Sequence, residues 1–199
     1  MANEEQHLIE SAQRGDVDSF NQLVRLYEMR VYNVCYRMLG DPDAAADTAQ
    51  DTFISAYRNL DRFRGGMFRS WLLRIATNAC YDVLRARKRR PSTSLQALGT
   101  TDDDGVGFDL PDQGERPDEV ALRHELAAAI TRGLADLPED QRLVIILSDI
   151  QGMAYEEISA VTGANLGTVK SRLSRGRARL RDILRAGELL PSTFRHDGG

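Results

Sequence analysis

The spacing of the apolar residues limits the fold of this chain more than any other feature, because they recur at steps of three and four. Residues 17–39 show this most clearly: Val17, Phe20, Leu23, Val24, Tyr27, Val31, Val34 and Met38. With 3.6 residues per helical turn, such residues share one face of an α-helix, which we expect to be buried. No segment alternates as a half-buried strand does. The sequence therefore predicts an all-α fold.

The first half of the chain should contain helices at about 17–39, 43–60 and 68–90. Residues 40–42, Gly-Asp-Pro, end the first helix, and a turn at 64–66 follows the second. We expect Ala49, Phe53, Ala56 and Leu60 to face inward on the second helix, and Phe68, Leu72, Ile75, Ala79 and Val83 on the third.

The second half should contain helices at about 118–135, from 137 onward, at 155–162 and from 166 to about 185. Glu139 and Asp140 suit the first turn of the second of these, where the helix dipole favours acids. Its apolar side includes Val144, Ile145, Leu147 and Ile150.

The net charge of −4 is distributed unevenly. Residues 166–185 carry seven basic side chains and one acid, and residues 91–119 carry eight acids and one arginine. The stretch after Pro91 is rich in Ser, Thr, Asp and Gly, which is typical of a flexible tether. The sequence thus predicts two small helical domains, residues 1–90 and 117–187, joined by a flexible acidic linker, 91–116, with a tail at 188–199.

A helix-turn-helix is predicted at 155–185, where a short helix and a turn containing Gly163 precede a long basic helix. Leu166, Val169, Leu173, Leu180 and Leu184 would anchor that helix. Its other side presents Thr168, Lys170, Ser171, Ser174 and Arg175 towards the major groove, with Arg172, Arg177, Arg179 and Arg181 towards phosphates. Arg175 suits a bidentate contact with guanine. A basic amphipathic helix also fits a merely solvated face, and many regulators carry this motif.

The helix at 68–90 carries a second unusual stripe. Trp71, Arg74, Asn78, Tyr81, Arg85 and Lys88 share one side. Aromatic rings stack on unpaired bases while arginines hold phosphates, which favours a strand-opening surface. Trp71 and Tyr81 taken singly fit a buried core equally well.

Two segments resemble a known family. DTAQDTFISAYRNLDRFRGGMFRSWLLRIATNACYDVLRARKRR (47–90) resembles region 2 of the extracytoplasmic-function (ECF) sigma factors, and LPEDQRLVIILSDIQGMAYEEISAVTGANLGTVKSRLSRGRARLRDIL (137–184) resembles their region 4. The resemblance implies a non-enzymatic subunit that binds core RNA polymerase and directs promoter-specific initiation by recognising and opening promoter DNA. It implies no cofactor, no metal and no catalytic residue, and an anti-sigma factor as partner.

The resemblance also implies roles for particular residues. Asp47, Gln50, Asp51 and Phe53 would dock on the clamp of the largest polymerase subunit, and the flap would be a further polymerase contact. Arg64, Gly65, Gly66 and Met67 would form the loop that captures a flipped base of the minus-ten element. Trp71, Arg74, Asn78, Tyr81, Arg85 and Lys88 would contact adjacent minus-ten DNA. Thr168, Lys170, Ser171, Arg172, Ser174, Arg175, Arg177 and Arg179 would bind the minus-thirty-five element.

Three residues depart from the family pattern. Ala46 stands where an acid is common, which weakens an acidic docking surface. Ala154 replaces a hydroxyl residue that would cap the short helix, so the cap must come from elsewhere or be lost. Gly176 stands where alanine is usual and should cost the helix up to ~1 kcal/mol.

Other features bear on compartment and on rival functions. Without an apolar run of about 18 residues or a basic leader, we expect a cytoplasmic protein with no membrane insertion. Cys35 and Cys80 lie in apolar helical patterns and are expected to be buried thiols. A regulator that binds an operator alone is one rival, but the stripe at 71–88 and the tether disfavour it. A metal-dependent hydrolase using Asp102–Asp104 is another, and the scattered histidines disfavour that.

Overall fold

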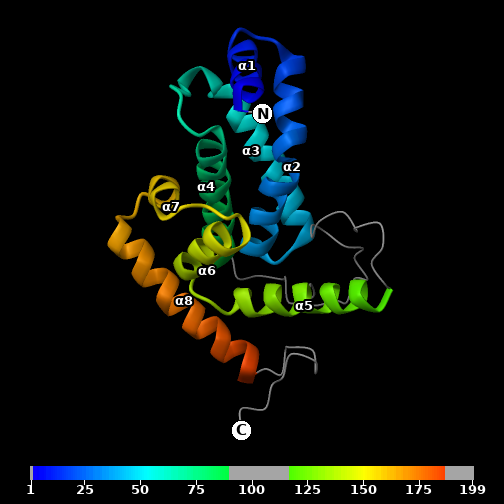
Figure 1. The fold of residues 1–199 in the computed structure, drawn as a ribbon, viewed down its shortest axis with the longest axis vertical. Helices are drawn as coiled ribbons and strands as arrows, with labels where there is room; N and C mark the ends of the chain where they lie inside the picture. Colours follow the sequence, from blue (N-terminus) through cyan, green and yellow to red (C-terminus); the bar gives the residue numbers. More distant parts are fainter. Residues whose placement is uncertain (1, 90–116, 187–199) are drawn as a thin grey trace.

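The computed structural model describes residues 2–89 and 117–186, with the side chains of 4–89 and 125–186. The elements are α1 (Ala2–Gln13), α2 (Val17–Leu39), α3 (Pro42–Arg58), the 3-10 helix η1 (Leu60–Arg62), α4 (Phe68–Arg89), α5 (Pro117–Ala135), α6 (Glu139–Ile145), the π-helix η2 (Ile146–Ile150), α7 (Tyr155–Thr162) and α8 (Leu166–Ala186). These residues contain no strand, which confirms the all-α prediction (Figure 1). None of their helices is long and apolar enough to cross a membrane. The predicted linker and tail lie outside the described residues.

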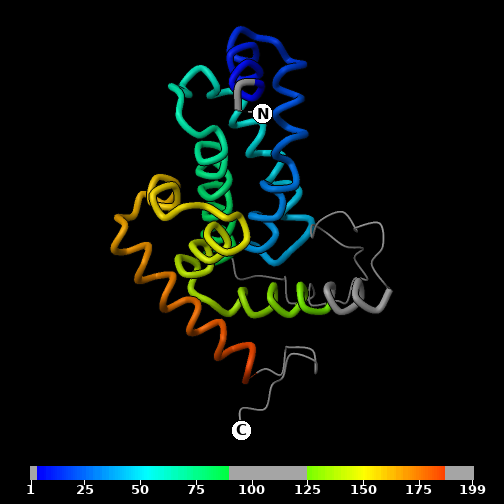
Figure 2. The backbone as a smooth tube through the Cα atoms, viewed as in Figure 1, coloured from blue at the N-terminus to red at the C-terminus, as the bar shows by residue number. Residues whose placement is uncertain are grey.

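Local signals fix the ends of α2 and α3 as the sequence predicts. Gly40 ends α2 in the left-handed conformation, with φ of 68°, and its N–H donates to the Tyr36 carbonyl. Asp41 then caps α3 by accepting a hydrogen bond from the Ala44 N–H at 3.1 Å. Because the two caps are adjacent, the chain reverses within a few residues and α3 packs beside α2 (Figure 2).

The buried face of α4 is rotated from the predicted one. Phe68 and Leu72 are buried as predicted, whereas Ile75, Ala79 and Val83 are only half-buried. The buried face continues instead through residues that were not predicted to face inward, Leu73, Ala76, Thr77 and Cys80. In the structure α2 and α3 cover one side of α4, and α7 from the other half covers another.

The second half packs α6 closely against α8, and Gly176 permits that contact. A Cβ atom at Gly176 would lie 2.9 Å from Cδ1 of Ile145 and 3.3 Å from Cβ of Gln141. The glycine therefore has a packing role in addition to the intrinsic helix cost expected from its sequence position.

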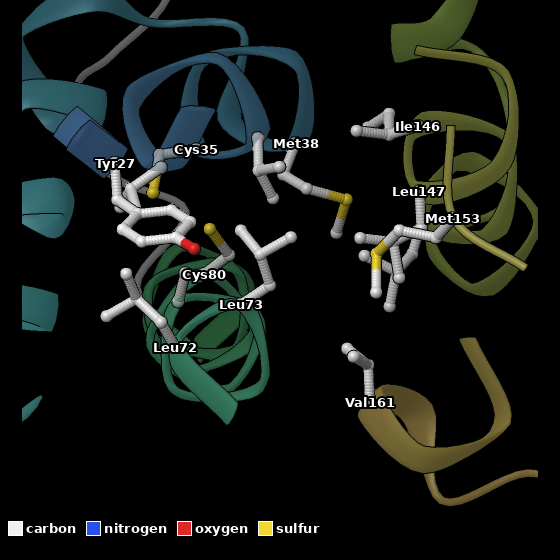
Figure 3. Close-up of a cluster of buried hydrophobic side chains, with 14 of the residues drawn as sticks. Tyr27, Cys35, Met38, Leu72, Leu73, Cys80, Ile146, Leu147, Met153 and Val161 are labelled. Carbon is white, nitrogen blue, oxygen red and sulfur yellow. The ribbon is translucent and has the colours of Figure 1, made fainter. Parts of the chain in front are cut away.

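The two halves share one hydrophobic core. Met38 of α2 and Leu73 of α4 face Ile146, Leu147 and Met153 of the C-terminal half, and all five are at most 3% exposed (Figure 3). Cys35 and Cys80 are free, buried thiols nearby, as predicted. Hydrogen bonding to Cys80 and burial raise the pKa of Cys35, so the Cys35 thiol is protonated.

Buried arginine Arg142 joins the two halves through backbone carbonyls. Its guanidinium donates to the carbonyl of Met38 at 2.6 Å, of Ala135 at 2.5 Å and of Leu137 at 3.2 Å. Burial lowers its pKa, but the pKa of a free arginine is so high that the charge remains. We call this packing of α6 and α7 against α2 and α4 the closed arrangement.

Candidate nucleic-acid interface

An open apolar groove of about 870 Å³ lies on the surface along the junction of α2 and α3. Its lining residues are Val17, Phe20, Asn21, Val24, Glu28, Met29, Tyr32, Ala46, Ala49, Gln50, Phe53, Ile54, Tyr57 and Arg58. Val17, predicted to be buried, is 53% exposed, because it lies in the first turn of α2 and faces the groove. Met29, Ile54 and Tyr57 are also exposed, at 50%, 41% and 43%. Such a concentration of exposed apolar side chains is typical of a protein-binding surface.

The residues predicted to dock on polymerase lie on and beside this groove. Gln50 and Phe53 line it, and so does Ala46, the residue that replaces an acid. Asp47 and Asp51 are exposed one helical turn apart on α3, outside the lining. The surface therefore combines an apolar groove with two neighbouring carboxylates.

The loop predicted to capture a base projects between two buried aromatic anchors. Arg64, Gly65, Gly66 and Met67 are all exposed. Both glycines have positive φ, 94° and 91°, a conformation that other residues rarely adopt. Phe63 before the loop and Phe68 after it are buried with their ring centroids 5.6 Å apart, and the Trp71 ring lies 5.4 Å from Phe63 and 5.5 Å from Phe68.

The stripe on α4 divides into exposed charges and half-buried rings. Arg74, Asn78, Arg85 and Lys88 are exposed, whereas Trp71 and Tyr81 are half-buried against the core. Trp71 thus belongs to the aromatic cluster beneath the loop. Burial raises the pKa of Tyr81, and nearby Asp140 of α6 adds to that shift.

Acidic residues of the C-terminal half contact both ends of α4. Lys88 pairs with Glu139 at 2.9 Å, and Arg69 pairs with Glu157 at 2.8 Å. The Ser70 hydroxyl donates to the same Glu157 oxygen at 3.2 Å. The closed arrangement therefore covers part of the predicted minus-ten surface.

Glu157 supplies one half of a capping box at the start of α7. Its second carboxylate oxygen accepts a hydrogen bond from the Ala154 N–H at 2.9 Å. Burial opposes ionisation of Glu157, but hydrogen bonds from Arg69, Ala154 and Ser70 outweigh it and lower its pKa. The side-chain hydrogen bond that a hydroxyl at position 154 would make to the first turn is lost, as one of the two predicted outcomes, while Glu157 satisfies the Ala154 N–H.

The helix-turn-helix is present as predicted. Gly163 ends α7 with φ of 69°, and the Asn165 side chain accepts from the Thr168 N–H at 2.8 Å at the start of α8. Val169 and Leu173 are buried, but Leu166, predicted as an anchor, is 39% exposed because it precedes the packed part of the helix.

The residues predicted to bind the minus-thirty-five element fall into two groups. Lys170, Ser171, Ser174, Arg175 and Arg179 are exposed, and Thr168 is half-buried beside them. Arg172 pairs with Asp140 at 2.9 Å, and Arg177 donates from Nε to Asp149 at 2.9 Å. The hydrogen bonds and charge of Asp149 raise the pKa of Arg177. These two arginines are held by carboxylates of the same domain and stabilise its packing.

Sequence reasoning missed Arg142, Glu157 and Asp149. The spacing of Ala154 and Glu157 was a usable signal, because a glutamate at the third helical position commonly caps the helix start. No pattern marked Arg142 as buried, since its carbonyl partners are set by tertiary packing.

Known proteins match both halves in the predicted order. The model for Sigma-70 region 2 matches residues 23–90, and that for Sigma-70, region 4 matches residues 127–180, together more than half of the chain. The ECF RNA polymerase sigma factor SigW of Bacillus subtilis is 37% identical over 89% of this chain and 95% of its own length. The chain belongs to the ECF sigma factors. It is therefore a sigma factor, which directs promoter-specific transcription.

Other relatives of this sigma factor agree. The RNA polymerase sigma-H factor of Pseudomonas aeruginosa is 38% identical over 87% of this chain and 90% of its own. SigE of Mycolicibacterium smegmatis is 39% identical over 83% of this chain, which spans 62% of that longer protein.

Two solved structures are similar in fold to this chain. CnrH in complex with the cytosolic domain of CnrY has a TM-score of 0.67 at 30% identity, with 92% of this chain and 98% of that one covered. The Bartonella quintana sigma factor RpoE in complex with the anti-sigma factor NepR has a TM-score of 0.63 at 29% identity, with 83% and 96% covered.

Proposed function

We propose that this sigma factor binds core RNA polymerase through the α2–α3 groove, opens the minus-ten element with α4 and the 64–67 loop, and reads the minus-thirty-five element with α8. The observation that carries the proposal is the separation of the three surfaces, since no residue of α4 or α8 lines the groove. Polymerase and DNA can therefore be held at the same time. Asp47, Gln50, Asp51 and Phe53 serve the polymerase clamp.

In the minus-ten surface, the glycine loop receives an unstacked base and the α4 charges hold the backbone. Arg74, Asn78, Arg85 and Lys88 supply the polar contacts, while Trp71 and Tyr81 provide ring faces. Removing a base from the stack costs a few kcal/mol, which contacts in the loop must offset. In the minus-thirty-five surface, Arg175 and Lys170 lie on the exposed face of α8, where base edges and phosphates can be reached.

The closed arrangement must open for both elements to be bound. Elements centred about 25 base pairs apart are separated by roughly 85 Å at 3.4 Å per base pair, whereas α4 contacts α7 directly. An extended linker over 91–116 reaches at most about 90 Å. Its length thus suits domains 1–90 and 117–187 placed on the two elements, joined through effective concentration.

The proposal extends to partners, chemistry and location. An anti-sigma factor is proposed as a partner, supported by the likeness to CnrH and RpoE, each solved in complex with another protein. The chain itself performs no catalysis and acts with polymerase in the cytoplasm. The polymerase carries out all of the chemistry.

The test pairs two exposed apolar residues of α2. Met29 lines the groove, whereas Leu26, which is 57% exposed, does not. Run-off transcription from a genomic fragment pool with core polymerase should give transcripts that share two upstream elements. In a binding assay, Met29→Arg should reduce the affinity for core polymerase about tenfold or more, because the interface would bury an unpaired charge, which is costly. Leu26→Arg should leave that affinity unchanged. Equal affinities would contradict the groove assignment. Absence of any promoter-specific transcript with the wild type would contradict the function.

A further inference from the structure

The N-terminal helix α1 precedes the matched family region, which begins at residue 23. Ile9 and Ala12 of α1 are buried, at 2% and 4% exposed, and they hold the helix on the bundle. The last residue of α1, Gln13, reaches the segment that leads into the glycine loop.

Gln13 bridges the two ends of the 3-10 turn η1. Its side-chain nitrogen donates to the carbonyl of Leu60 and to the carbonyl of Phe63, each at 2.9 Å. An amide nitrogen carries two hydrogens, so this geometry uses both donors. The Phe63 N–H also donates to the Leu60 carbonyl at 3.1 Å, which closes the turn from within.

The Phe63 carbonyl belongs to the peptide that joins Phe63 to Arg64, the first residue of the loop. Its orientation therefore sets the direction in which the loop leaves the bundle. Two consecutive glycines follow, and glycine loses more conformational freedom on ordering than any other residue. On the far side, the Met67 carbonyl accepts from the Ser70 and Trp71 N–H groups at 3.0 and 3.2 Å. Gln13 supplies the polar anchor at the entry to the loop.

We propose that Gln13 is a positioning residue for the minus-ten base-capture loop, an inference that rests on the proposed function. Gln13 touches no base; it acts through the Phe63 carbonyl by restricting the orientations of Arg64–Met67. The side chain is itself exposed, and α1 is held by its buried residues, so the fold does not depend on this amide. The effect of losing it falls on base capture.

The experiment replaces Gln13 by Met, which keeps the side-chain length and removes both donors, and uses the full chain bound to core polymerase. Gln6→Met is the matched control, because Gln6 on the same helix donates only to Glu10 at the surface. Fluorescence anisotropy would measure binding of single-stranded minus-ten oligonucleotides, with the element taken from the wild-type transcripts. One oligonucleotide carries the preferred base at the captured position and the other carries a substitution.

The Gln13→Met holoenzyme should bind the preferred oligonucleotide about three- to tenfold more weakly than the wild-type holoenzyme, because the loop loses two neutral hydrogen bonds that order it. It should also discriminate less between the preferred and the substituted base. Core affinity should match that of Gln6→Met. Gln13→Ala should reproduce the loss in discrimination, which a general loss of stability would not cause. Unchanged discrimination in both Gln13 variants would overturn the assignment. Failure of the wild-type holoenzyme to discriminate would instead overturn the proposed function beneath it.

Discussion

Helices α4 and α8 are both proposed to bind DNA, yet their surroundings differ. Lys170, Ser174 and Arg175 lie exposed on α8, whereas α4 is contacted by α7 and its Lys88 pairs with Glu139. The minus-thirty-five surface is therefore accessible in the closed arrangement, and the minus-ten surface is partly covered. The free-energy cost of opening the closed arrangement therefore falls on the step that separates the DNA strands at the minus-ten element. The first contact of α8 with duplex DNA does not require it.

The largest expected effect comes from Arg142, which holds the covered side closed. Arg142→Met should lower the free energy of unfolding by about 3 kcal/mol, because three carbonyls lose their donor, two of them buried, and each unsatisfied buried group costs ~1–3 kcal/mol, partly relieved by water. Urea unfolding would measure this, with the exposed Arg132→Met as the control. Equal stabilities of the two variants would show that Arg142 does not hold the halves together.

A substitution of Arg175 on the accessible helix α8 tests the difference between the two DNA-binding surfaces. Arg175→Ala should cost ~1–3 kcal/mol in binding to minus-thirty-five duplex, and the loss should appear in the free protein as well as in the holoenzyme. By contrast, Lys88→Ala should weaken DNA binding only in the holoenzyme, because Lys88 pairs with Glu139 in the closed arrangement of the free chain. Titrations of both variants with and without core polymerase would measure this. A loss for Lys88→Ala in the free protein would break the comparison.

The packing of α8 is tested by two glycines on that helix. Gly176→Ala should destabilise the protein by ~1–2 kcal/mol, since overpacking against Ile145 costs more than the gain in helix propensity. A Cβ at Gly167 meets only the Asn165 side chain at 3.4 Å, so Gly167→Ala should be neutral or slightly stabilising. Thermal unfolding of the two variants would separate them. Stabilisation by Gly176→Ala would mean that α6 moves away at little cost.

The smallest effect is expected at Glu157, which contacts the covered helix. Glu157→Gln keeps an acceptor for the Ala154 N–H but removes the charge that faces Arg69, so it should cost ~1 kcal/mol or less. The folded pKa of Glu157 is lowered, so its contribution is present above the unfolded pKa and is lost as the pH falls through the folded value. Stability curves of wild type and variant should therefore begin to converge as the pH falls through the range where a free glutamate titrates, and should meet below the lowered folded pKa. Parallel curves would exclude this carboxylate as the source.

The sequence located most of the helices for local reasons, but it did not predict α1. Gly40, Asp41 and Gly163 act on neighbouring backbone groups, so the helix boundaries beside them are visible without any tertiary information. The apolar spacing likewise found the buried side of α2, but it misplaced Val17 and part of the core face of α4. Both errors arose because spacing identifies a stripe on a helix and not the elements that cover it.

The sequence by itself determined an all-helical chain, most of its helix boundaries, its helix-turn-helix and the family to which it is similar. Only the tertiary structure decided that the two halves share one core, that Glu157 bonds to the start of α7 while contacting α4, and that Gln13 anchors the glycine loop. Arg142 and Met38 are 104 positions apart, and Arg69 and Glu157 are 88 apart. Helix periodicity and capping act over a few residues, so contacts across such distances depend on how whole helices pack against one another.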